Sequence, residues 1–260
     1  MKVRIDKMLV DQGFAASRER AQALILAGRV LADEQRIDKP GTSIASTAVL
    51  RMLGNDLRYV SRGGLKLEKA LAHWQIDPTG LACIDVGAST GGFTDCFLQH
   101  GAASVLAVDT GYGQIASKLR SDPRVTLRER CNARLLPPGD LIPNSPAPIT
   151  LLALDVSFIS ATLVLPAVLA ALVPAALVPE GATWQGEAVI LVKPQFEAGR
   201  EHVGKGGIVR DQAARQIAID RVHDCVLALH GTHTDIIDSP IRGMEGNHEY
   251  LLRARFNAPA

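Results

Sequence analysis

Cysteine is scarce in this chain, and its arrangement favours neither a disulfide framework nor a metal centre. The 260 residues contain four cysteines, at positions 83, 96, 131 and 225, with no C-x-x-C pair and no zinc-ligand spacing. This pattern favours reduced thiols in a cytoplasmic protein, and no metal site is predicted. The first residues agree, because Lys2, Arg4, Asp6 and Lys7 interrupt the apolar stretch that a secretory signal peptide needs.

Long hydrophobic runs are also nearly missing, with one exception. Residues 159–178 are almost all apolar, and about 20 such residues could cross a bilayer. Pro166 and Pro174 interrupt this run, which is rich in alanine and lies between two strand-like segments. A buried helix connecting two parallel strands is therefore favoured over a membrane span, which stays the alternative.

The sequence has little net charge, but the charge is unevenly distributed. The formal net charge is +1, yet residues 1–70 hold 13 Lys and Arg against 8 Asp and Glu. The remainder holds 15 against 19, so a basic head precedes a mildly acidic body. Such a head is typical of proteins that bind a polyanion.

The sequence lacks the G-x-G-x-x-G spacing of nicotinamide and flavin sites but contains another glycine-rich turn. The segment CIDVGASTGGFTD, at 83–95, reads as a strand, a tight turn and the start of a helix. A second strand-like run ends in Asp109, which lies 24 positions after Asp85 and is suited to hydrogen-bonding ribose hydroxyls. This pattern resembles the S-adenosylmethionine site of class I methyltransferases. A glycine turn of any α/β protein is the alternative interpretation.

Strand and helix signals alternate after this turn, which predicts a mostly parallel sheet with helices on both faces. Two strand-like runs, HTDIIDSPI and NHEYLLRARF, predict an antiparallel hairpin that closes the sheet. The predicted strands lie at 82–86, 104–109, 124–129, 150–156 and 188–193. The predicted helices between them begin near Phe93, Gln114, Ser160 and Asp211.

A small α+β module precedes the sheet. Ile5, Met8 and Leu9 form an apolar stripe, and Ser17 is a candidate N-cap for a helix that ends before Gly28. The order of helix, helix and strand resembles the S-four-like RNA-binding domain of ribosomal proteins. The alternative to RNA binding is that the charged residues of this module only keep a small helical unit in solution. The basic side chains that such a domain would set against phosphates are Arg4, Lys7, Arg18, Arg20 and Arg29, with Arg62 beyond it.

Polar residues stand where buried strands should begin or end. LLALDVSF ends its apolar run at Asp155, AVILVKPQFE ends its run at Lys193, and Glu249 lies near the start of the last strand. Gly63 and Gly64 are expected to form a flexible joint before a helix-like segment that begins at Leu65, and Lys66 stands at the start of this segment. A charge at the end of a buried strand is costly to desolvate and is often functional, although a structural salt bridge is the alternative for each residue alone.

Six short motifs of the chain, taken together, resemble those of the TlyA (haemolysin A-like) family of rRNA 2′-O-methyltransferases. They are SRGG-x-K-L, DVGASTGGFTD, LDVSF, VKPQFE, GKGGIVRD and GN-x-E-Y-L. The resemblance implies a class I methyltransferase (Rossmann-like) fold with a mostly parallel seven-stranded sheet. It implies an S-four-like domain over 1–58, a linker over 59–64 and an FtsJ-like domain over 65–257. One departure concerns the linker, where some relatives read R-x-W-V and this chain has Arg58-Tyr59-Val60.

The resemblance also implies the chemistry and the site. S-adenosylmethionine is the expected cofactor, ribosomal RNA the expected partner, cytidine the expected nucleotide, and Lys66, Asp155, Lys193 and Glu249 are the expected catalytic set. Lys193 either accepts the proton of the 2′-hydroxyl as a neutral amine or stays protonated and stabilises the alkoxide. The expected cofactor-binding residues are Asp85, Gly87, Ser89, Thr90, Gly91, Gly92, Phe93, Asp109 and Asn132.

Two other functions stay open at this point. One is an RNA-binding protein that keeps the fold without activity, and the other is a membrane-active protein, which the haemolysin name suggests. A glycine-containing loop after Lys193 is a candidate for RNA contact or for a mobile lid, and a plain solvated loop is the alternative. Its charged members are Glu197, Arg200, Lys205 and Arg210.

Overall fold

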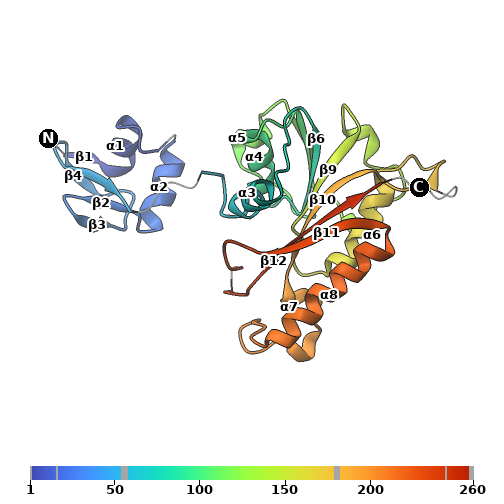
Figure 1. Ribbon diagram of the computed structural model, residues 1–260. Coiled ribbons are helices and arrows are strands. Elements are labelled where there is room, and N and C mark those ends of the chain that lie inside the picture. Colours follow the sequence, from blue (N-terminus) through green and yellow to red (C-terminus); the bar gives the residue numbers. More distant parts are fainter. Residues whose placement is uncertain (1, 16, 54–57, 179–181, 244, 258–260) are drawn as a thin grey trace. The chain divides into compact units, whose positions relative to one another are not determined.

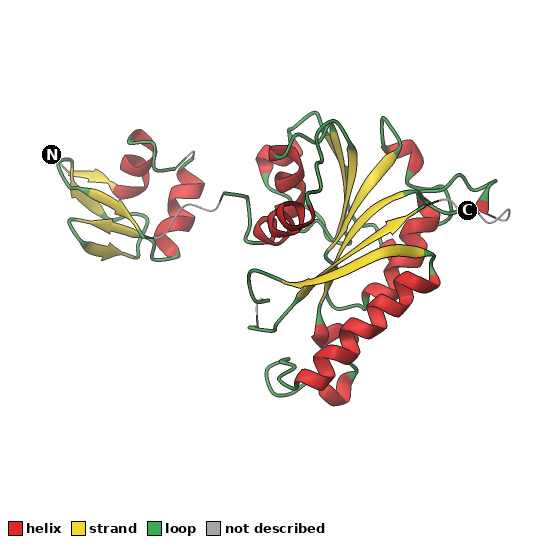
Figure 2. Ribbon diagram, viewed as in Figure 1, coloured by secondary structure: helices red, strands yellow, loops and turns green. Residues whose placement is uncertain are grey.

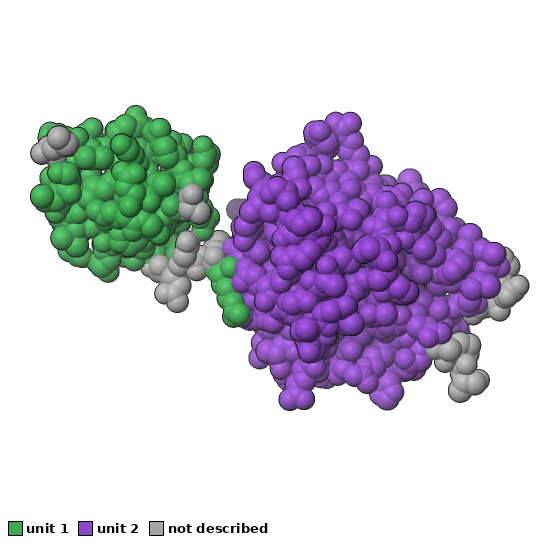
Figure 3. Space-filling view, turned by 90° about the horizontal axis from the view of Figure 1, so that it is seen from above, with its two compact units in different colours: residues 1–58 green, residues 59–260 purple. Residues whose placement is uncertain are grey.

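The computed structural model describes residues 2–15, 17–53, 58–178, 182–243 and 245–257. The chain forms two compact units, Met1–Arg58 and Tyr59–Ala260 (Figure 1, Figure 3). Each unit has its own hydrophobic core, so each is described by itself.

The first unit packs two helices against short strands. Strands β1 and β4 form one antiparallel pair, and a second antiparallel sheet has the order β3-β2-β5. Its elements are β1 (Lys2–Arg4), α1 (Ile5–Asp11), α2 (Arg18–Leu26), β2 (Val30–Ala32), β3 (Gln35–Ile37), β4 (Ser43–Ala45) and β5 (Leu50–Met52).

The predicted helix signals of this unit are confirmed. Ile5, Met8 and Leu9 are all buried in its core. The hydroxyl of Ser17 accepts a hydrogen bond from the backbone N–H of Arg20, as an N-cap does. Helix α2 is followed by Gly28, whose φ of 65° lies in the left-handed region that favours glycine after a helix.

The second unit is built on one seven-stranded sheet with the order β11-β12-β10-β9-β6-β7-β8. Strands β6 to β10 run parallel, and β12 is antiparallel to both β10 and β11 (Figure 2). The predicted sheet and closing hairpin are therefore confirmed. The strands are β6 (Ala82–Val86), β7 (Ser104–Val108), β8 (Val125–Arg128), β9 (Ile149–Leu154), β10 (Gly186–Val192), β11 (Gly231–Asp238) and β12 (Tyr250–Phe256).

Helices cover both faces of this sheet because its central strands are apolar on both sides. In β6, Cys83 packs with α3 and α4 on one face, whereas Ile84 and Val86 pack with α6 and α8 on the other. The helices of this unit are α3 (Gly63–Trp74), α4 (Gly92–Gln99), α5 (Ser117–Arg120), α6 (Ala161–Ala171), α7 (Pro194–Glu197) and α8 (Gln212–Ala228), with 3₁₀ turns η1 (Ala133–Leu135), η2 (Ile142–Asn144) and η4 (Arg200–His202).

The apolar run at 159–178 contains the crossover helix α6 between the parallel strands β9 and β10. Val164, Leu165 and Val168 of this helix are buried in the core, whereas Pro166 is exposed. Across the part of the chain that the structure describes, no helix is long and apolar enough to cross a membrane. The prediction of a buried crossover helix is confirmed.

The segment before β6 differs from the prediction of a flexible glycine joint. Gly63 and Gly64 form the first turn of α3, so the helix begins two residues earlier than the predicted start at Leu65. A side chain at Gly64 would meet the ring of Tyr59, which is buried, and the Val60 N–H donates to Asp95 at 2.8 Å. These contacts attach residues 59–64 to the second unit. Their role as a linker stays a prediction.

A buried carboxylate organises the basic face of the first unit. Asp6 is fully buried and accepts two hydrogen bonds from Arg4 and one each from Arg18 and Gln22. The Arg4 guanidinium, above all, holds the pKa of Asp6 well below its usual range. Two of the predicted RNA-binding arginines are thus held in place by one acidic residue.

We expect Asp6→Asn to loosen the first unit selectively, because an amide cannot accept this many charged hydrogen bonds. Backbone amides of α1 and α2 should exchange with solvent about 10- to 100-fold faster, as the loss of charge-assisted hydrogen bonds implies. Amides of the seven-stranded sheet should be unchanged and serve as the internal control. Since the pKa of Asp6 is lowered, its stabilising effect is present at neutral pH and is lost only as the pH falls through that value. Unchanged exchange in α1 and α2 at pH 7 would contradict this role.

Candidate active site

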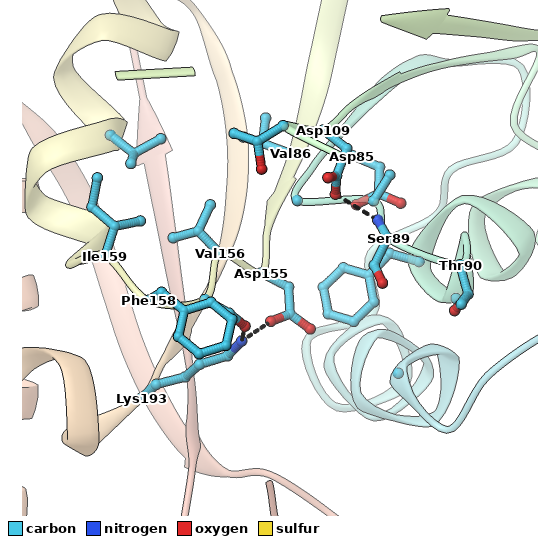
Figure 4. Close-up of a pocket in the computed structure, with 18 of the residues that line it drawn as sticks. Asp85, Val86, Ser89, Thr90, Asp109, Asp155, Val156, Phe158, Ile159 and Lys193 are labelled. Atoms are coloured by element: carbon cyan, nitrogen blue, oxygen red, sulfur yellow. Dashed lines mark hydrogen bonds and ion pairs between the residues drawn. The ribbon is translucent and has the colours of Figure 1, made fainter. Parts of the chain in front are cut away.

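One large cavity opens at the carboxyl edge of the sheet, where β6, β7, β9 and β10 end. It encloses about 650 Å³ and is lined by the segments that follow these four strands and β8, by the start of α3 and by residues between β11 and β12. Ligands of open α/β sheets bind at this edge, because the connections there leave a crevice. Figure 4 shows that the labelled side chains fall into two groups, one around Asp155 and Lys193 and one around Asp109 and Ser89.

The glycine turn forms one wall of the cavity. Gly87 has a φ of 89°, and a side chain there would lie 2.3 Å from the carbonyl oxygen of Asp155. Gly91, with a φ of 94°, precedes the first turn of α4. Both positions therefore require glycine, and they let a ligand approach the backbone next to a helix N-terminus. Seven of the nine predicted cofactor residues lie along this wall or at its edge: Asp85, Gly87, Ser89, Thr90, Gly91, Gly92 and Phe93.

Asp85 is a buried carboxylate, and one of its two oxygens has no hydrogen-bond partner among the described residues. Its Oδ2 accepts hydrogen bonds from the N–H and the hydroxyl of Thr94, at 2.8 and 2.7 Å. Its Oδ1 is buried and has no hydrogen-bond partner among the described residues, and Asp85 lines the cavity. Burial, aided by the charges of Asp155 and Asp109, raises the pKa of Asp85 to about 7. An unpaired carboxylate oxygen beside a cavity is a site for a cationic group.

Asp109 holds the glycine turn in place as well as lining the cavity. Its Oδ2 accepts a hydrogen bond from the Ser89 N–H at 2.7 Å, and its Oδ1 accepts one from the Gly111 N–H at 2.6 Å. Each oxygen keeps a further lone pair that could accept from a ligand hydroxyl. The structural role of Asp109 as a clamp between two loops was not predictable from its position after a strand.

Asn132 lies on the far side of the same cavity, after β8. Its side chain accepts a hydrogen bond from the Arg134 N–H at 3.2 Å and caps the short turn η1. The N–H of Cys131 bonds to the carbonyl of Asp109, which ties this loop to the end of β7. Asn132 and Arg134 are both exposed and both line the cavity.

The four residues predicted as a catalytic set lie together and alternate in charge. Lys66 Nζ donates to Glu249 Oε2 at 2.6 Å and lies 3.8 Å from Asp155 Oδ2. Lys193 Nζ lies 2.5 Å from Asp155 Oδ1. The side chains of Lys66, Lys193, Glu249 and Asp155 are between 3% and 18% exposed. Segments far apart in the sequence thus supply one buried row of charges, which is called the charged row below.

The two lysines of the charged row are held differently. Lys66 donates a hydrogen bond to Glu249, whereas Lys193 forms a short ion pair with Asp155. Lys193 also donates a hydrogen bond to the hydroxyl of Ser157, at 2.7 Å.

Two features of this site were missed by sequence analysis. Ser157 was not singled out, although it stands two residues after Asp155. Phe158 is 90% exposed with a φ of 66°, an unusual backbone conformation for an aromatic residue, and it lines the cavity beside Phe196. The LDVSF run contains both residues and is the signal that could have indicated them.

The prediction that Glu197 contacts RNA or lies in a solvated loop is wrong. Its side chain is buried and accepts hydrogen bonds from the Ser160 hydroxyl and the Ala161 N–H, at 2.5 and 2.7 Å. Burial raises the pKa of Glu197. The residue caps α6 and joins the loop after β9 to the helix that follows Lys193. Arg200, Lys205 and Arg210 are exposed, as both interpretations of that loop required.

The predicted RNA-binding residues lie in both units. Arg4 and Arg18 are about half exposed and bound to Asp6. Lys7 is exposed, and Arg29 donates to the Leu53 carbonyl at 3.0 Å. Arg20 is half-buried. Arg62 belongs to the second unit, where it precedes α3 and lines the cavity. RNA contact by these six residues stays a prediction.

Comparison with known proteins assigns both units. The profile of FtsJ-like methyltransferases matches residues 59–256, and that of the S4 domain matches residues 3–49. The protein YqxC of Bacillus subtilis is 47% identical over 251 residues, which are 96% of this chain and 85% of that protein. The 16S/23S rRNA (cytidine-2′-O)-methyltransferase TlyA of Mycobacterium tuberculosis is 41% identical and covers 98% of this chain and 90% of its own.

Other similar proteins carry a hemolysin name. Hemolysin A of Brachyspira hyodysenteriae is 38% identical over 96% of this chain and 98% of its own. A solved structure named "Putative hemolysin from Streptococcus thermophilus" has a TM-score of 0.72 and 41% identity, and covers 99% of this chain and 90% of its own.

We expect Asp85→Asn to stabilise the protein above neutral pH. The raised pKa means that the folded protein holds a proton on this carboxyl that the unfolded chain has already released, so stability is lost as the pH rises from the ordinary pKa of a carboxyl to about 7. The melting temperature of the wild type should fall over this range and level off above pH 7, and that of Asp85→Asn should fall less. The matched control is Asp77→Asn, an exposed aspartate whose pKa is lowered. Equal pH dependence in wild type and Asp85→Asn would contradict the assignment.

Proposed function

Because the chain belongs to the FtsJ-like methyltransferase family and carries an S4 domain, we propose that it methylates ribose 2′-hydroxyls of ribosomal RNA. The observation that carries the proposal is the charged row at the mouth of the cavity, Lys66, Glu249, Asp155 and Lys193. Burying four charges is costly unless they serve a purpose that apolar side chains cannot serve. A non-catalytic RNA-binding protein has no need for such a row beside a ligand cavity.

The lining of the cavity fits S-adenosylmethionine. Among the described residues nothing donates to Asp85 Oδ1, so it can accept from the ammonium of the methionine part, and the backbone at Gly87 lines the cavity near it. Asp109 keeps lone pairs for the ribose hydroxyls, and Asn132 lies at the expected adenine side. The cofactor, when bound, supplies an electrophilic methyl group on a sulfonium.

The charged row has the residues to prepare a hydroxyl for attack on that methyl group. A ribose 2′-hydroxyl is a weak acid, so its oxygen needs either a base or a positive charge as it becomes nucleophilic. Asp155 Oδ1, which lies 2.5 Å from Lys193 Nζ, keeps a further lone pair that can accept from the incoming hydroxyl. Lys193 next to it either takes the proton or stabilises the developing oxyanion. Lys66, held by Glu249, adds a second positive charge near Asp155.

An exposed aromatic ring at the mouth of the cavity suits a nucleic-acid substrate. Phe158 is 90% exposed in the loop that carries Asp155, and a large exposed ring in a strained backbone is seldom retained for stability. Stacking of a base on such a ring would hold an unpaired nucleotide over the charged row. This supports RNA rather than a small molecule as the methyl acceptor.

The first unit supports the choice of a structured RNA. Lys7 is exposed, and Arg4 and Arg18 are pre-oriented by Asp6, so their charges are available to phosphates at low entropic cost. The similarity to TlyA, which is named as acting on cytidine in 16S and 23S rRNA, supports cytidine as the target. Ribosomal RNA as the substrate implies action in the cytoplasm.

The direct test is to incubate the protein with methyl-labelled S-adenosylmethionine and with 30S subunits, 50S subunits or the naked rRNAs. We expect label at a single ribose, resistant to alkaline cleavage at that position, in one or both subunits. Label on a base, or no label on any RNA while the cofactor binds, would refute ribose methylation. Liposome leakage measured with the same preparation tests the membrane-active alternative.

Substitution of Lys193 separates its two possible roles. Lys193→Ala should abolish methyl transfer and leave S-adenosylmethionine affinity near normal. If Lys193 is the base, Lys193→Arg should be almost as inactive, because a guanidinium stays protonated at any usable pH. The measurement is the single-turnover rate at saturating RNA and cofactor. High activity of Lys193→Arg would exclude base catalysis and assign charge stabilisation to this residue.

Binding of the S4 domain to RNA predicts a salt-dependent effect of Lys7→Ala. The affinity for rRNA should fall at low salt, and the slope of log affinity against log salt should decrease by about 1, as expected when one phosphate contact is lost. Calorimetry should show unchanged cofactor binding. Lys69→Ala, at an exposed lysine of α3, is the matched control and should leave the slope unchanged. Identical slopes for both variants would argue against a phosphate contact at Lys7.

A further inference from the structure

Lys193 has two neighbours at its Nζ atom, and both come from one short segment. Asp155 and Ser157 stand two residues apart after β9, and their Oδ1 and Oγ atoms lie 2.5 and 2.7 Å from Nζ. The two contacts differ in kind. Asp155 forms a short ion pair with Lys193, whereas the hydroxyl of Ser157 accepts a hydrogen bond from it.

This difference matters because only a directed contact orients the nitrogen. A Coulomb attraction depends on distance and leaves the amino group free to rotate about the Cε–Nζ bond. A hydrogen bond fixes one N–H direction, since its strength falls steeply away from linearity. Once the Cε–Nζ bond and one N–H are fixed, the remaining directions of a tetrahedral nitrogen are fixed too. In the described part of the chain, Ser157 is the hydrogen-bond partner that sets them.

Ser157 also lies on the open side of the charged row. The side chains of Lys193 and Asp155 are 8% and 18% exposed, whereas Ser157 is an exposed residue that lines the cavity. A serine at this position has no packing role that would require its hydroxyl. Its hydroxyl reaches the buried amine from the side by which a ribose would enter.

The segment that carries Ser157 is itself held at both ends. At its start, the Asp155 N–H bonds to the Val86 carbonyl at 2.9 Å. At its end, Ser160 and Ala161 donate to the buried Glu197, which belongs to the helix directly after Lys193. The loop that bears Ser157 and the strand end that bears Lys193 are therefore coupled through one carboxylate. This coupling joins the two backbone segments that carry Oγ and Nζ.

We propose that Ser157 is the positioning residue for Lys193. Its hydroxyl orients the Nζ atom, so that a remaining direction of the nitrogen points to the 2′-oxygen of the bound ribose. For a neutral amine that direction carries the lone pair that takes the hydroxyl proton as the O–CH₃ bond forms and the S–CH₃ bond breaks. For an ammonium it carries the N–H that stabilises the oxyanion. The inference rests on the proposed methyl transfer but holds for either role of Lys193.

The test compares Ser157→Ala with Ser157→Thr, which keeps the hydroxyl. Ser157→Ala should lower the single-turnover rate of rRNA methylation about 10- to 100-fold, as the loss of one hydrogen bond to a charged group implies. The KM for rRNA and the affinity for S-adenosylmethionine should stay within about twofold, because rate alone depends on the orientation of Nζ. Ser157→Thr should retain most of the wild-type rate. Ser121→Ala, at an exposed serine after α5, is the matched control and should behave as wild type.

A second comparison asks whether Ser157 acts through Lys193. In a Lys193→Ala background, adding Ser157→Ala should cause no further loss of the residual rate, because the group to be oriented is gone. The proposal is overturned if Ser157→Ala keeps the full rate, if only KM or cofactor affinity changes, if Ser157→Thr is as slow as Ser157→Ala, or if the two losses are additive.

These outcomes are distinguishable from failure of the proposed function itself. If the wild type and Ser121→Ala transfer no methyl group to any rRNA, ribose methylation is refuted before Ser157 is considered. If both transfer it at one site, the comparison of the Ser157 variants decides the positioning role alone.

Discussion

The buried charged row is the constraint on which the second unit depends. Four ionisable side chains with 3% to 18% exposure are tolerated because each lies beside a group of the opposite type, lysine beside carboxylate. Lys66 comes from α3, Asp155 and Lys193 follow adjacent parallel strands, and Glu249 precedes an antiparallel one. The sheet order is thus what brings the charges together. A displacement of any one strand would leave a buried charge without its partner.

The half of the cavity that is lined by the glycine turn depends on a different constraint, because the backbone of the segment after β9 must approach this turn closely. Gly87 packs against the carbonyl of Asp155, so the wall of the cofactor cavity touches the segment that carries the charged row. Asp109 clamps the same wall through Ser89. A methyl donor and a methyl acceptor bound on the two sides would therefore be positioned by one rigid frame. Such a frame reduces the entropy that must be lost before reaction.

Buried carboxylates act as organisers in both units. Asp6 gathers two arginines in the first unit, and Glu197 joins two loops of the second. In each case the acidic side chain is buried, whereas the side chains or loops that it holds lie near the surface or the cavity. The chemistry of this protein thus relies on residues that do not themselves face the solvent.

The amino-acid sequence predicted the order of the elements, the glycine turn, and Asp155 and Lys193 at the ends of neighbouring strands. These could be predicted because apolar periodicity and strand ends are local signals, and the ends of parallel strands meet at one edge of a sheet. Lys66 and Glu249 were expected as members of the same set from the family resemblance. The packing of the folded chain was needed to show that Glu197 is buried, that Gly63 and Gly64 begin a helix, and that Ser157 contacts Lys193. Ser157 and Lys193 are 36 residues apart, as are Glu197 and Ala161. Contacts over such separations depend on how the loops pack, and burial of a charged residue depends on what covers it, neither of which is encoded in a local pattern.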